Sequence, residues 1–497
     1  MLPLPAFEQT FTELPDIMFA KVAPTPVTKP EAMLLNDNLA QELGLDPDWL
    51  SSPEALQILS GNQAVPDTIA MAYAGHQFGH LSPRLGDGRA HLLGELVTPT
   101  GQRVDIQLKG SGVTPYSRRG DGRAPLGPVL REYLVSEFMH AVGVPTSRSL
   151  AAISSGESVW RQGTEPGAIL TRVAASHIRV GSFEYAASQG VEFVKALADY
   201  TLGRHFPEVE NSQESYLSLL QCAVAKQTQL IAQWMSFGFI HGVMNTDNML
   251  VSGETVDYGP CAFMDTYVPS QVYSYIDRQG RYRYDHQPGI GQWNLVRLAQ
   301  ALVSVMTIDQ DSDAVVAKAQ AAINGYEQQY KQAYAQHMAA KLGLQDDTAA
   351  LVDELLAILA KDKLDYTLTF RYLMTLLAPT STAYGMPEQA YIASPALQKW
   401  QLNWLQRVEQ ETGPEQALSL MAQHNPIFIP RNHLLDAALK AAYQDDLTQI
   451  NDLLEVISEP FTYRPEWQHL SLAPKPCLLY TSPSPRDVEE SRMPSSA

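Results

Sequence analysis

The sequence predicts an α+β fold in two lobes, a small β-rich lobe followed by a larger helical lobe. Between residues 67 and 188, Gly-rich loops separate short segments in which apolar and polar residues alternate, the period of a half-buried strand. From residue 189 onward, apolar residues recur at the helical spacing over long segments. The chain has 497 residues, of which 45% are hydrophobic. That length and composition suit roughly two to four domains with ample core.

The first two predicted units are an N-terminal arm over residues 1–66 and the β-rich lobe over residues 67–188. Prolines punctuate the arm, which includes a predicted helix at Lys29–Leu43, and we expect the arm to pack on the body. In the β-rich lobe, a Thr-Pro-Thr-Gly turn predicts a hairpin. The elements predicted in this lobe are the strands Ala90–Val97, Gln102–Lys109, Glu157–Arg161 and Ala168–Val173, and the helix Leu130–Val142.

The helical lobe is predicted over residues 189–470. The segments with helix-period apolar spacing are Val191–Phe206, Glu214–Phe237, Gln292–Met306, Ala314–Leu342, Thr348–Lys361, Ala396–Glu411 and Leu434–Ile457. Residues 471–497 are rich in Pro and Ser and lack periodicity, so we expect disorder there. We also hypothesise that this tail is not native coding sequence.

Composition excludes several classes of protein. Lys and Arg number 35 against 54 Asp and Glu, and 35 − 54 gives −19, which argues against nonspecific binding of nucleic acid. Cys222, Cys261 and Cys477 are too scattered for a disulfide framework or a zinc site. No apolar run approaches the roughly 20 residues that cross a bilayer, and the N-terminus lacks a signal pattern. We therefore expect a cytoplasmic protein that binds neither membrane nor nucleic acid.

The stretch Phe239–Gly259 carries two polar clusters, Asp247 with Asn248 and then Asp257. A Ser-Gly turn between them predicts a tight hairpin that brings the clusters together. Mg²⁺ bound to a nucleotide takes one or two protein carboxylates beside phosphate oxygens. We therefore expect Asn248 and Asp257 to hold Mg²⁺, or Mn²⁺ in its place. The alternative is a surface hairpin with solvated side chains.

The spacing in this stretch resembles the protein-kinase catalytic loop H-R-D-x-x-x-x-N followed by D-F-G. His241 and Asn248 stand seven positions apart, and Asp257 begins the sequence D-Y-G. Val243 occupies the place of the kinase catalytic Asp, which makes Asp247 the candidate base. Together with the order of the lobes, this motif predicts a protein-kinase-like two-lobed fold.

The β-rich lobe offers cations for phosphate groups. Lys109 ends a predicted strand and Glu132 lies on the next helix, the order of the kinase Lys–Glu pair. The alternative is an exposed Lys at a strand end. The Gly-rich loops 85–89 and 110–123 flank this strand. Glycine N–H groups and nearby arginines suit a phosphate, although most such loops are plain turns.

Four further residues have two interpretations each. Arg172 and Arg179 stand seven apart and are either phosphate clamps, which we favour, or partners of the many acidic residues. His76 and His80 have a spacing that suits zinc on a helix, but the Gly-broken context favours structural histidines.

Long motifs across the chain are similar to those of the selenoprotein O family of protein adenylyltransferases. The similarity covers nearly the whole chain to about Trp467, including NPIFIPRNH. The other motifs are YAGHQFG (73–79), LGDGRA (85–90), QLKGSGxTPYSRxGDGRA (107–124), LREYLVSE (130–137), TRVAxSHIRVGxFEYAA (171–187), FIHGVMNTDNM (239–249) and VDYGP (256–260).

The resemblance implies a kinase-like fold that binds ATP in a flipped orientation and moves AMP to Ser, Thr or Tyr hydroxyls of proteins. It implies that Asp247 accepts the hydroxyl proton and that Asn248 and Asp257 bind Mg²⁺. The residues implied to contact ATP are Gly86, Gly88, Arg89, Lys109, Asp121, Gly122, Arg172, Arg179 and Asp257. Many members end in a Cys- or selenocysteine-bearing motif, and Cys477 does not lie in one, which puts redox regulation through the tail in doubt.

Two other functions stay open. One is ordinary transfer of the γ-phosphoryl group, which the D-Y-G sequence and the Lys–Glu order suggest if Val243 is ignored. The other is a catalytically silent ATP-binding scaffold, against which the presence of Asp247, Asn248 and Asp257 argues.

Overall fold

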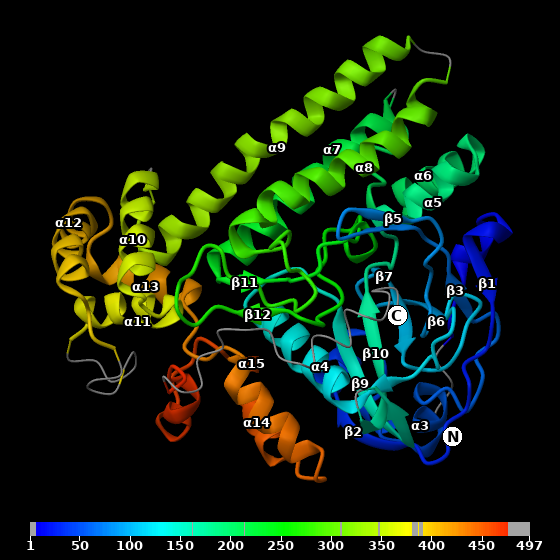
Figure 1. The fold of residues 1–497 in the computed structure, drawn as a ribbon, viewed down its shortest axis with the longest axis horizontal. Coiled ribbons are helices and arrows are strands. Elements are labelled where there is room, and N and C mark those ends of the chain that lie inside the picture. The colour runs from blue at the N-terminus through cyan, green and yellow to red at the C-terminus, as the bar shows by residue number, and fades with distance from the viewer. Residues whose placement is uncertain are drawn as a thin grey trace.

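The computed structural model describes residues 6–161, 163–212, 214–308, 311–345, 348–379, 386 and 391–475. In this part of the chain the fold is mixed α/β, with a small β-rich region near the N-terminus and helices through most of the remainder (Figure 1). None of the described helices is long and apolar enough to cross a membrane. The prediction of a disordered tail falls from residue 476 onward outside the described residues.

One sheet of eight strands forms the centre of the β-rich region, among the residues that the structure describes. Its order is β1-β3-β6-β7-β10-β9-β2, and β8 pairs with β10. The bounds are β1 Phe19–Lys21, β2 Glu31–Leu35, β3 Ile69–Met71, β6 Ala90–Val97, β7 Arg103–Lys109, β8 Ala124–Pro125, β9 Arg148–Trp160 and β10 Thr164–Ala174. Two small ladders lie apart: β4 Gly75–Gln77 with β5 His80–Ser82, and β11 Phe239–Ile240 with β12 Ala262–Phe263.

The predicted hairpin is present as β6 and β7, which pair antiparallel. The two later strands are also present but longer than predicted. The helix predicted over Lys29–Leu43 is wrong in its first half, because β2 pairs there with β9. Only α1, Asp37–Glu42, is helical, and it begins after Asn36, whose side chain accepts the Leu39 N–H.

Strand alternation gives the sheet two different faces. Ile106 and Leu108 of β7 join a core with the short helices α1, α2 (Pro47–Leu50) and α3 (Pro53–Leu59). The alternate residue Lys109 reaches the opposite face, where α4 (Leu126–Ala141) packs across β9 and β10. A charged residue of β7 is thereby placed between the sheet and a helix.

The predicted helices are present within a few residues of their bounds, with one exception. Leu434–Ile457 is two helices, separated where Asp445 adopts φ +60, a left-handed conformation that no α-helix continues through. The prediction missed α5, α11 and α13. The helices are α5 Val180–Gln189, α6 Val191–His205, α7 Ser215–Ser236, α8 Gln287–Met306, α9 Ser312–Lys341, α10 Ala349–Asp362, α11 Tyr366–Leu377, α12 Pro395–Glu411, α13 Pro414–His424, α14 Asn432–Ala442 and α15 Thr448–Ser458.

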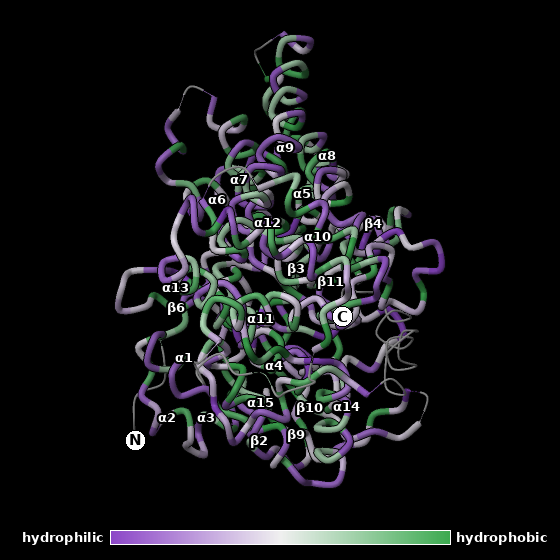
Figure 2. The backbone as a smooth tube through the Cα atoms, turned by 90° about the vertical axis from the view of Figure 1, so that its left-hand side faces the viewer, coloured by the Kyte–Doolittle hydropathy of each residue, from purple (hydrophilic) through white to green (hydrophobic). Residues whose placement is uncertain are grey.

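The long helices α7, α8 and α9 pack side by side (Figure 1). Near the end of the described chain, α14 and α15 pack against α4. Hydrophobic segments run through the interior around α4 and α11, whereas the outer loops are largely hydrophilic (Figure 2). The core that contains α4 also includes β11, β12 and Tyr258. This continuous core fixes the segment 239–263 against the sheet.

Candidate active site

Four charged side chains form a buried cluster between the sheet and α4. Lys109 Nζ lies 2.8 Å from Glu132 Oε2 and 2.8 Å from Asp257 Oδ1. Arg172 Nε contacts Glu132 Oε1, and its Nη2 lies 3.1 Å from Asp257 Oδ1. The four residues are between 2% and 8% exposed. The ion pair expected between Lys109 and Glu132 is present, and the alternative of an exposed Lys at a strand end is wrong.

The strand register explains the cluster. In the antiparallel pair β7–β10, Lys109 stands opposite Leu170 and Arg172 stands opposite Gln107. Residues two apart along a strand share a face, so Lys109 and Arg172 both reach the face covered by α4. Glu132 on α4 meets both cations from that side.

Asp257 is held as a carboxylate in this environment. Burial raises the pKa of Asp257, but Lys109 and Arg172 outweigh burial and Arg89 adds to their effect, so the pKa falls well below its usual range. The pKa of Glu132 is lowered by Arg172 and Lys109 in the same way, against burial. Asp257 also has φ +67, a strained backbone for a residue with a side chain. Such strain is typical of functional sites.

The two Gly-rich loops pack against each other beside Lys109. Gly110 N–H donates to Arg89 O at 2.7 Å between the loops, whereas Gly112 N–H donates to Gly122 O at 2.9 Å within the second loop. A Cβ added to Gly122, whose φ is +69, would lie 2.1 Å from the carbonyl carbon of Gly112. Gly122 thus permits the close packing inside the second loop, and the first loop contacts the second through Arg89 and Gly88.

The other predicted members of these loops have different surroundings. A Cβ on Gly86 would lie 2.3 Å from the Tyr116 ring, and Gly88 O accepts the Ser117 hydroxyl. Asp121 does not enter the buried cluster, because it is exposed and lies 2.8 Å from Arg161.

The pKa of Asp121 shows what surrounds this carboxylate. Burial raises it, but Arg161, the Arg123 N–H and Arg89 lower it to a net decrease. Arg89 therefore acts on the carboxylates of both Asp121 and Asp257.

The predicted hairpin within Phe239–Gly259 is wrong in its pairing. Val251 N–H donates to Ile178 O at 3.0 Å, whereas Thr255 N–H donates to Pro145 O at 2.9 Å. Each arm of the turn therefore pairs with a different segment, not with the other arm. The turn itself is present, with Gly253 at φ +83.

Asp247 is completely buried beneath β4. Its backbone O accepts Arg179 Nη1 at 2.7 Å, and its Oδ2 accepts Gln77 Nε2 at 3.3 Å. A Cβ added to Gly75 would lie 2.2 Å from Asp247 Oδ1. The absence of a side chain at Gly75 is therefore what permits the position of this carboxylate.

Asn248 presents an oxygen that suits a cation. Its Nδ2 donates to Val243 O at 3.1 Å, which fixes the orientation of the amide. Its Oδ1 is buried and makes no hydrogen bond within the described residues. No group of three or more His, Cys, Asp or Glu suited to a metal occurs in the described part of the chain. An Asn and an Asp are nevertheless the donor set expected for Mg²⁺ with a nucleotide.

Two carboxylates that the prediction did not single out organise the site. Asp87, buried within the first Gly-rich loop, accepts Tyr73 Oη at 3.1 Å and lies 3.5 Å from Arg179 Nη2, which itself lies over the Tyr73 ring. Glu184 lies 2.6 Å from His76 Nδ1, so the interpretation of His76 as a structural histidine is supported. Asp87 stands in the motif LGDGRA and Glu184 in FEYAA, so both carboxylates could have been singled out as site residues from the motifs.

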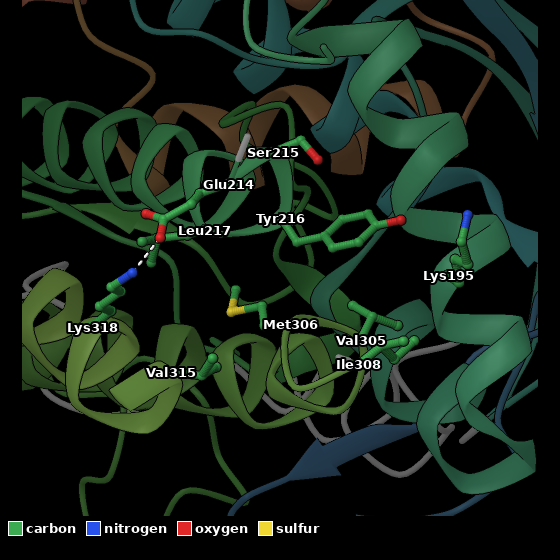
Figure 3. A pocket seen from close by; sticks show the side chains of 10 residues that line it. All are labelled: Lys195, Glu214, Ser215, Tyr216, Leu217, Val305, Met306, Ile308, Val315 and Lys318. Carbon is green, nitrogen blue, oxygen red and sulfur yellow. Dashed lines mark hydrogen bonds and ion pairs between the residues drawn. The ribbon is translucent and has the colours of Figure 1, made fainter. Parts of the chain in front are cut away.

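A cavity of about 200 Å³ lies elsewhere, among α6, α7, α8 and α9 (Figure 3). Apolar side chains, including Leu217 and Met306, form part of its wall, and Glu214 pairs with Lys318 at one end. None of the predicted site residues lines it. We therefore do not place the nucleotide there.

Comparison with known proteins agrees with the motif content. The family model "Protein adenylyltransferase SelO" matches residues 4–458. "Protein nucleotidyltransferase YdiU" of Halalkalibacterium halodurans is 50% identical over 485 residues, covering 95% of this chain and 96% of the relative. The protein of the same name from Rhodopseudomonas palustris is 50% identical over 480 residues, covering 95% of this chain and 96% of the relative. That from Methylorubrum populi is 48% identical over 488 residues, covering 96% of this chain and 98% of the relative. The chain therefore belongs to the SelO family of protein adenylyltransferases.

Proposed function

We propose that this enzyme moves AMP from ATP to Ser, Thr or Tyr hydroxyls of proteins, and that it does so with Mg²⁺ on a kinase-like two-lobed fold. The proposed units are residues 1–66, 67–188 and 189–470. The observation that carries the proposal is the buried cluster of Lys109, Glu132, Arg172 and Asp257. The buried Asn248 oxygen, which makes no hydrogen bond within the described residues, adds to it. Family membership supports nucleotide transfer in general.

The cations of the sheet would hold the phosphates. Lys109 and Arg172 are both matched by carboxylates, so ATP must compete with Asp257 for them. Arg89, Arg179, Gly86, Gly88, Gly122 and Asp121 complete the proposed set of ATP contacts. Charge-assisted hydrogen bonds from arginine to phosphate are among the strongest that proteins form.

Asn248 and Asp257 would hold Mg²⁺, or Mn²⁺ in its place. The Asn248 amide is fixed through its Nδ2, and its buried oxygen makes no hydrogen bond within the described residues, which supports this assignment. The bound ion would neutralise charge on the phosphates. The left-handed backbone at Asp257 sets the direction of its carboxylate.

Asp247 would act as the general base. The substrate hydroxyl oxygen attacks the α-phosphorus of ATP, the bond from that phosphorus to the bridging oxygen breaks, and pyrophosphate leaves. The hydroxyl proton passes to the Asp247 carboxylate. Because Asp247 is buried under β4, Gln77 must give up its hydrogen bond to Oδ2 when the hydroxyl enters.

ATP labelled at either the α- or the γ-phosphate tests the proposal. We expect acid-stable label on protein only from the α position, and only with divalent metal. Label from the γ position alone would establish phosphoryl transfer instead. If neither label is transferred while ATP still raises the melting temperature, the chain is a silent ATP-binding scaffold.

A further inference from the structure

Two arginines share one tryptophan on the helical side of the β4–β5 hairpin. The Arg281 guanidinium carbon lies 4.7 Å from the centre of the Trp293 ring, and that of Arg297 lies 4.8 Å from it. Trp293 and Arg297 are one helical turn apart on α8, and Arg281 comes from the loop before that helix. We call these three residues the Arg–Trp cluster.

Among the described residues, no carboxylate lies within ion-pair distance of either arginine of the cluster, although Arg297 acts on the Glu184 carboxylate and opposes the rise in its pKa that burial causes. The Nε atoms of Arg281 and Arg297 are buried and make no hydrogen bond within that part of the chain. By contrast, Arg283 of the same loop lies 2.6 Å from Asp285. Two guanidinium groups without a carboxylate in contact, within the described part of the chain, are unexpected in a protein whose net charge is −19.

The nearby carboxylates are already engaged. Asp277 accepts the backbone N–H groups of Arg281 and Tyr282 at 2.8 and 2.7 Å. Glu184 accepts the Thr246 hydroxyl and pairs with His76. Glu184 therefore acts on Arg297 only from beyond contact distance, and the cluster has capacity for an anion in direct contact that the described residues do not provide.

The cluster lies close to the proposed base. The Trp293 ring meets the His76 ring edge-on, with centroids 5.2 Å apart. A Cβ on Gly79 would lie 3.5 Å from the Arg281 guanidinium. In the same hairpin, Gln77 donates to Asp247. The β4–β5 hairpin thus contacts the cluster through His76 and Gly79, and it contacts Asp247 through Gln77.

We propose that Arg281 and Arg297 bind an acidic side chain of the protein substrate, close in sequence to the hydroxyl that receives AMP. This inference rests on the proposed function. A carboxylate can take two parallel hydrogen bonds from a guanidinium group, and the Trp293 ring shields one side of each group from water. The acidic remainder of the protein repels such a segment, so this site would fix its register.

Two peptides test the inference. One is a decapeptide with a central Ser and two Glu residues beside it, and its twin has Gln in place of both Glu residues. We expect the wild-type enzyme to transfer AMP to the Glu peptide with a kcat/KM about tenfold above that for the twin, as one charged hydrogen-bonded pair would give. Arg281→Gln with Arg297→Gln should reduce this ratio to about one.

Two further variants separate charge from packing. Arg281→Lys with Arg297→Lys keeps both charges and should keep part of the preference. Arg283→Gln removes one charge from the same loop and is the matched control, which should keep the full ratio. Melting temperatures measured on all variants identify any that fail to fold.

Several results would overturn the inference. They are a wild-type ratio near one, an unchanged ratio in the double Gln variant, or a double variant that loses affinity for ATP, which would assign the arginines to the nucleotide. A single-stranded RNA that displaces the Glu peptide through these arginines at lower concentration would reassign the site to nucleic acid.

Failure of the proposed function would be recognised separately. If neither peptide receives α-label, fluorescence anisotropy of the labelled peptides still measures docking. About tenfold tighter binding of the Glu peptide, lost in the double Gln variant, would support the cluster even without transfer. Equal binding of the two peptides would refute it.

Discussion

Glu132→Gln is the most direct perturbation of the buried cluster, because it removes one charge and little volume. Glu132 contacts Lys109 at 2.8 Å through one oxygen and Arg172 through the other, and it is 2% exposed. The four charges of the cluster sum to 0, and the substitution leaves +1. Removing one partner from a buried ion pair costs about 3–5 kcal/mol, because an uncompensated charge stays buried.

The substitution should also separate binding from catalysis. The extra positive charge favours the phosphates, so we expect ATP affinity to be kept. Lys109 loses one of the two carboxylates that orient it, and we expect kcat to fall about 100-fold, the effect of a displacement of about 1 Å. Calorimetric binding of ATP and transfer of α-label measure the two quantities.

Differential scanning fluorimetry measures the loss of stability, and salt provides the control. We expect a melting temperature lower by several degrees, with little change at high salt, because buried pairs are weakly screened. Glu327→Gln breaks the exposed pair with Lys331, whose side chains are 68% and 71% exposed, and should not change the melting temperature measurably. A Glu132→Gln protein that melts and transfers AMP like the wild type would show that this network does not organise the site.

Three other perturbations have clear expected outcomes. Gly75→Ala should displace the Asp247 carboxylate and lower transfer at least tenfold, whereas Gly289→Ala, which meets nothing within 4 Å, should not. Asp257→Asn should abolish metal-dependent transfer. Because the pKa of Asp257 is depressed, its stabilisation is fully present above the unfolded value near 3.8 and is lost as pH falls through the folded value. The melting-temperature gap to Asp257→Asn should therefore be constant from pH 8 to 5 and should narrow below about pH 4. Burial lowers the pKa of Lys341 to about 7, so the folded state binds fewer protons than the unfolded one above that pH. Between pH 7 and 9 the free energy of unfolding of the wild type should rise by about 2 kcal/mol relative to that of Lys341→Met. Urea denaturation at each pH measures both values, and a difference that does not change with pH would contradict the prediction.

The sequence predicted best what depends on local periodicity. The strand that ends at Lys109 and the helix that carries Glu132 both follow from spacing, and their meeting follows from the order of strand and helix. The prediction of a hairpin in Phe239–Gly259 was wrong because its two arms form hydrogen bonds with Ile178 and Pro145, and no local pattern indicates these partners. The helix predicted over Lys29–Leu43 was wrong in its first half for the same reason, because that half pairs with β9 as a strand.

The candidate site was predictable in its charges but not in its supports. Lys109, Arg172 and Asp257 stand in Gly- and Arg-rich motifs that suggest phosphate chemistry, and they meet in the structure. Asp87 and Glu184 hold Arg179 and His76 through contacts between segments about a hundred residues apart. Such supporting contacts depend on the finished packing, which a single sequence does not display.

Val243 explains in physical terms why the base would have to come from elsewhere. Its side chain is apolar, 4% exposed and packed in the interior, so this position offers no group that could accept a proton. Its backbone O instead accepts a hydrogen bond from Asn248 Nδ2, which fixes the orientation of that amide. Asp247 lies next to that amide, under a glycine that leaves room for its carboxylate. Val243, which stands where kinases have the catalytic Asp, therefore supports Asn248 through its backbone. The carboxylate proposed as the base is supplied by Asp247 instead.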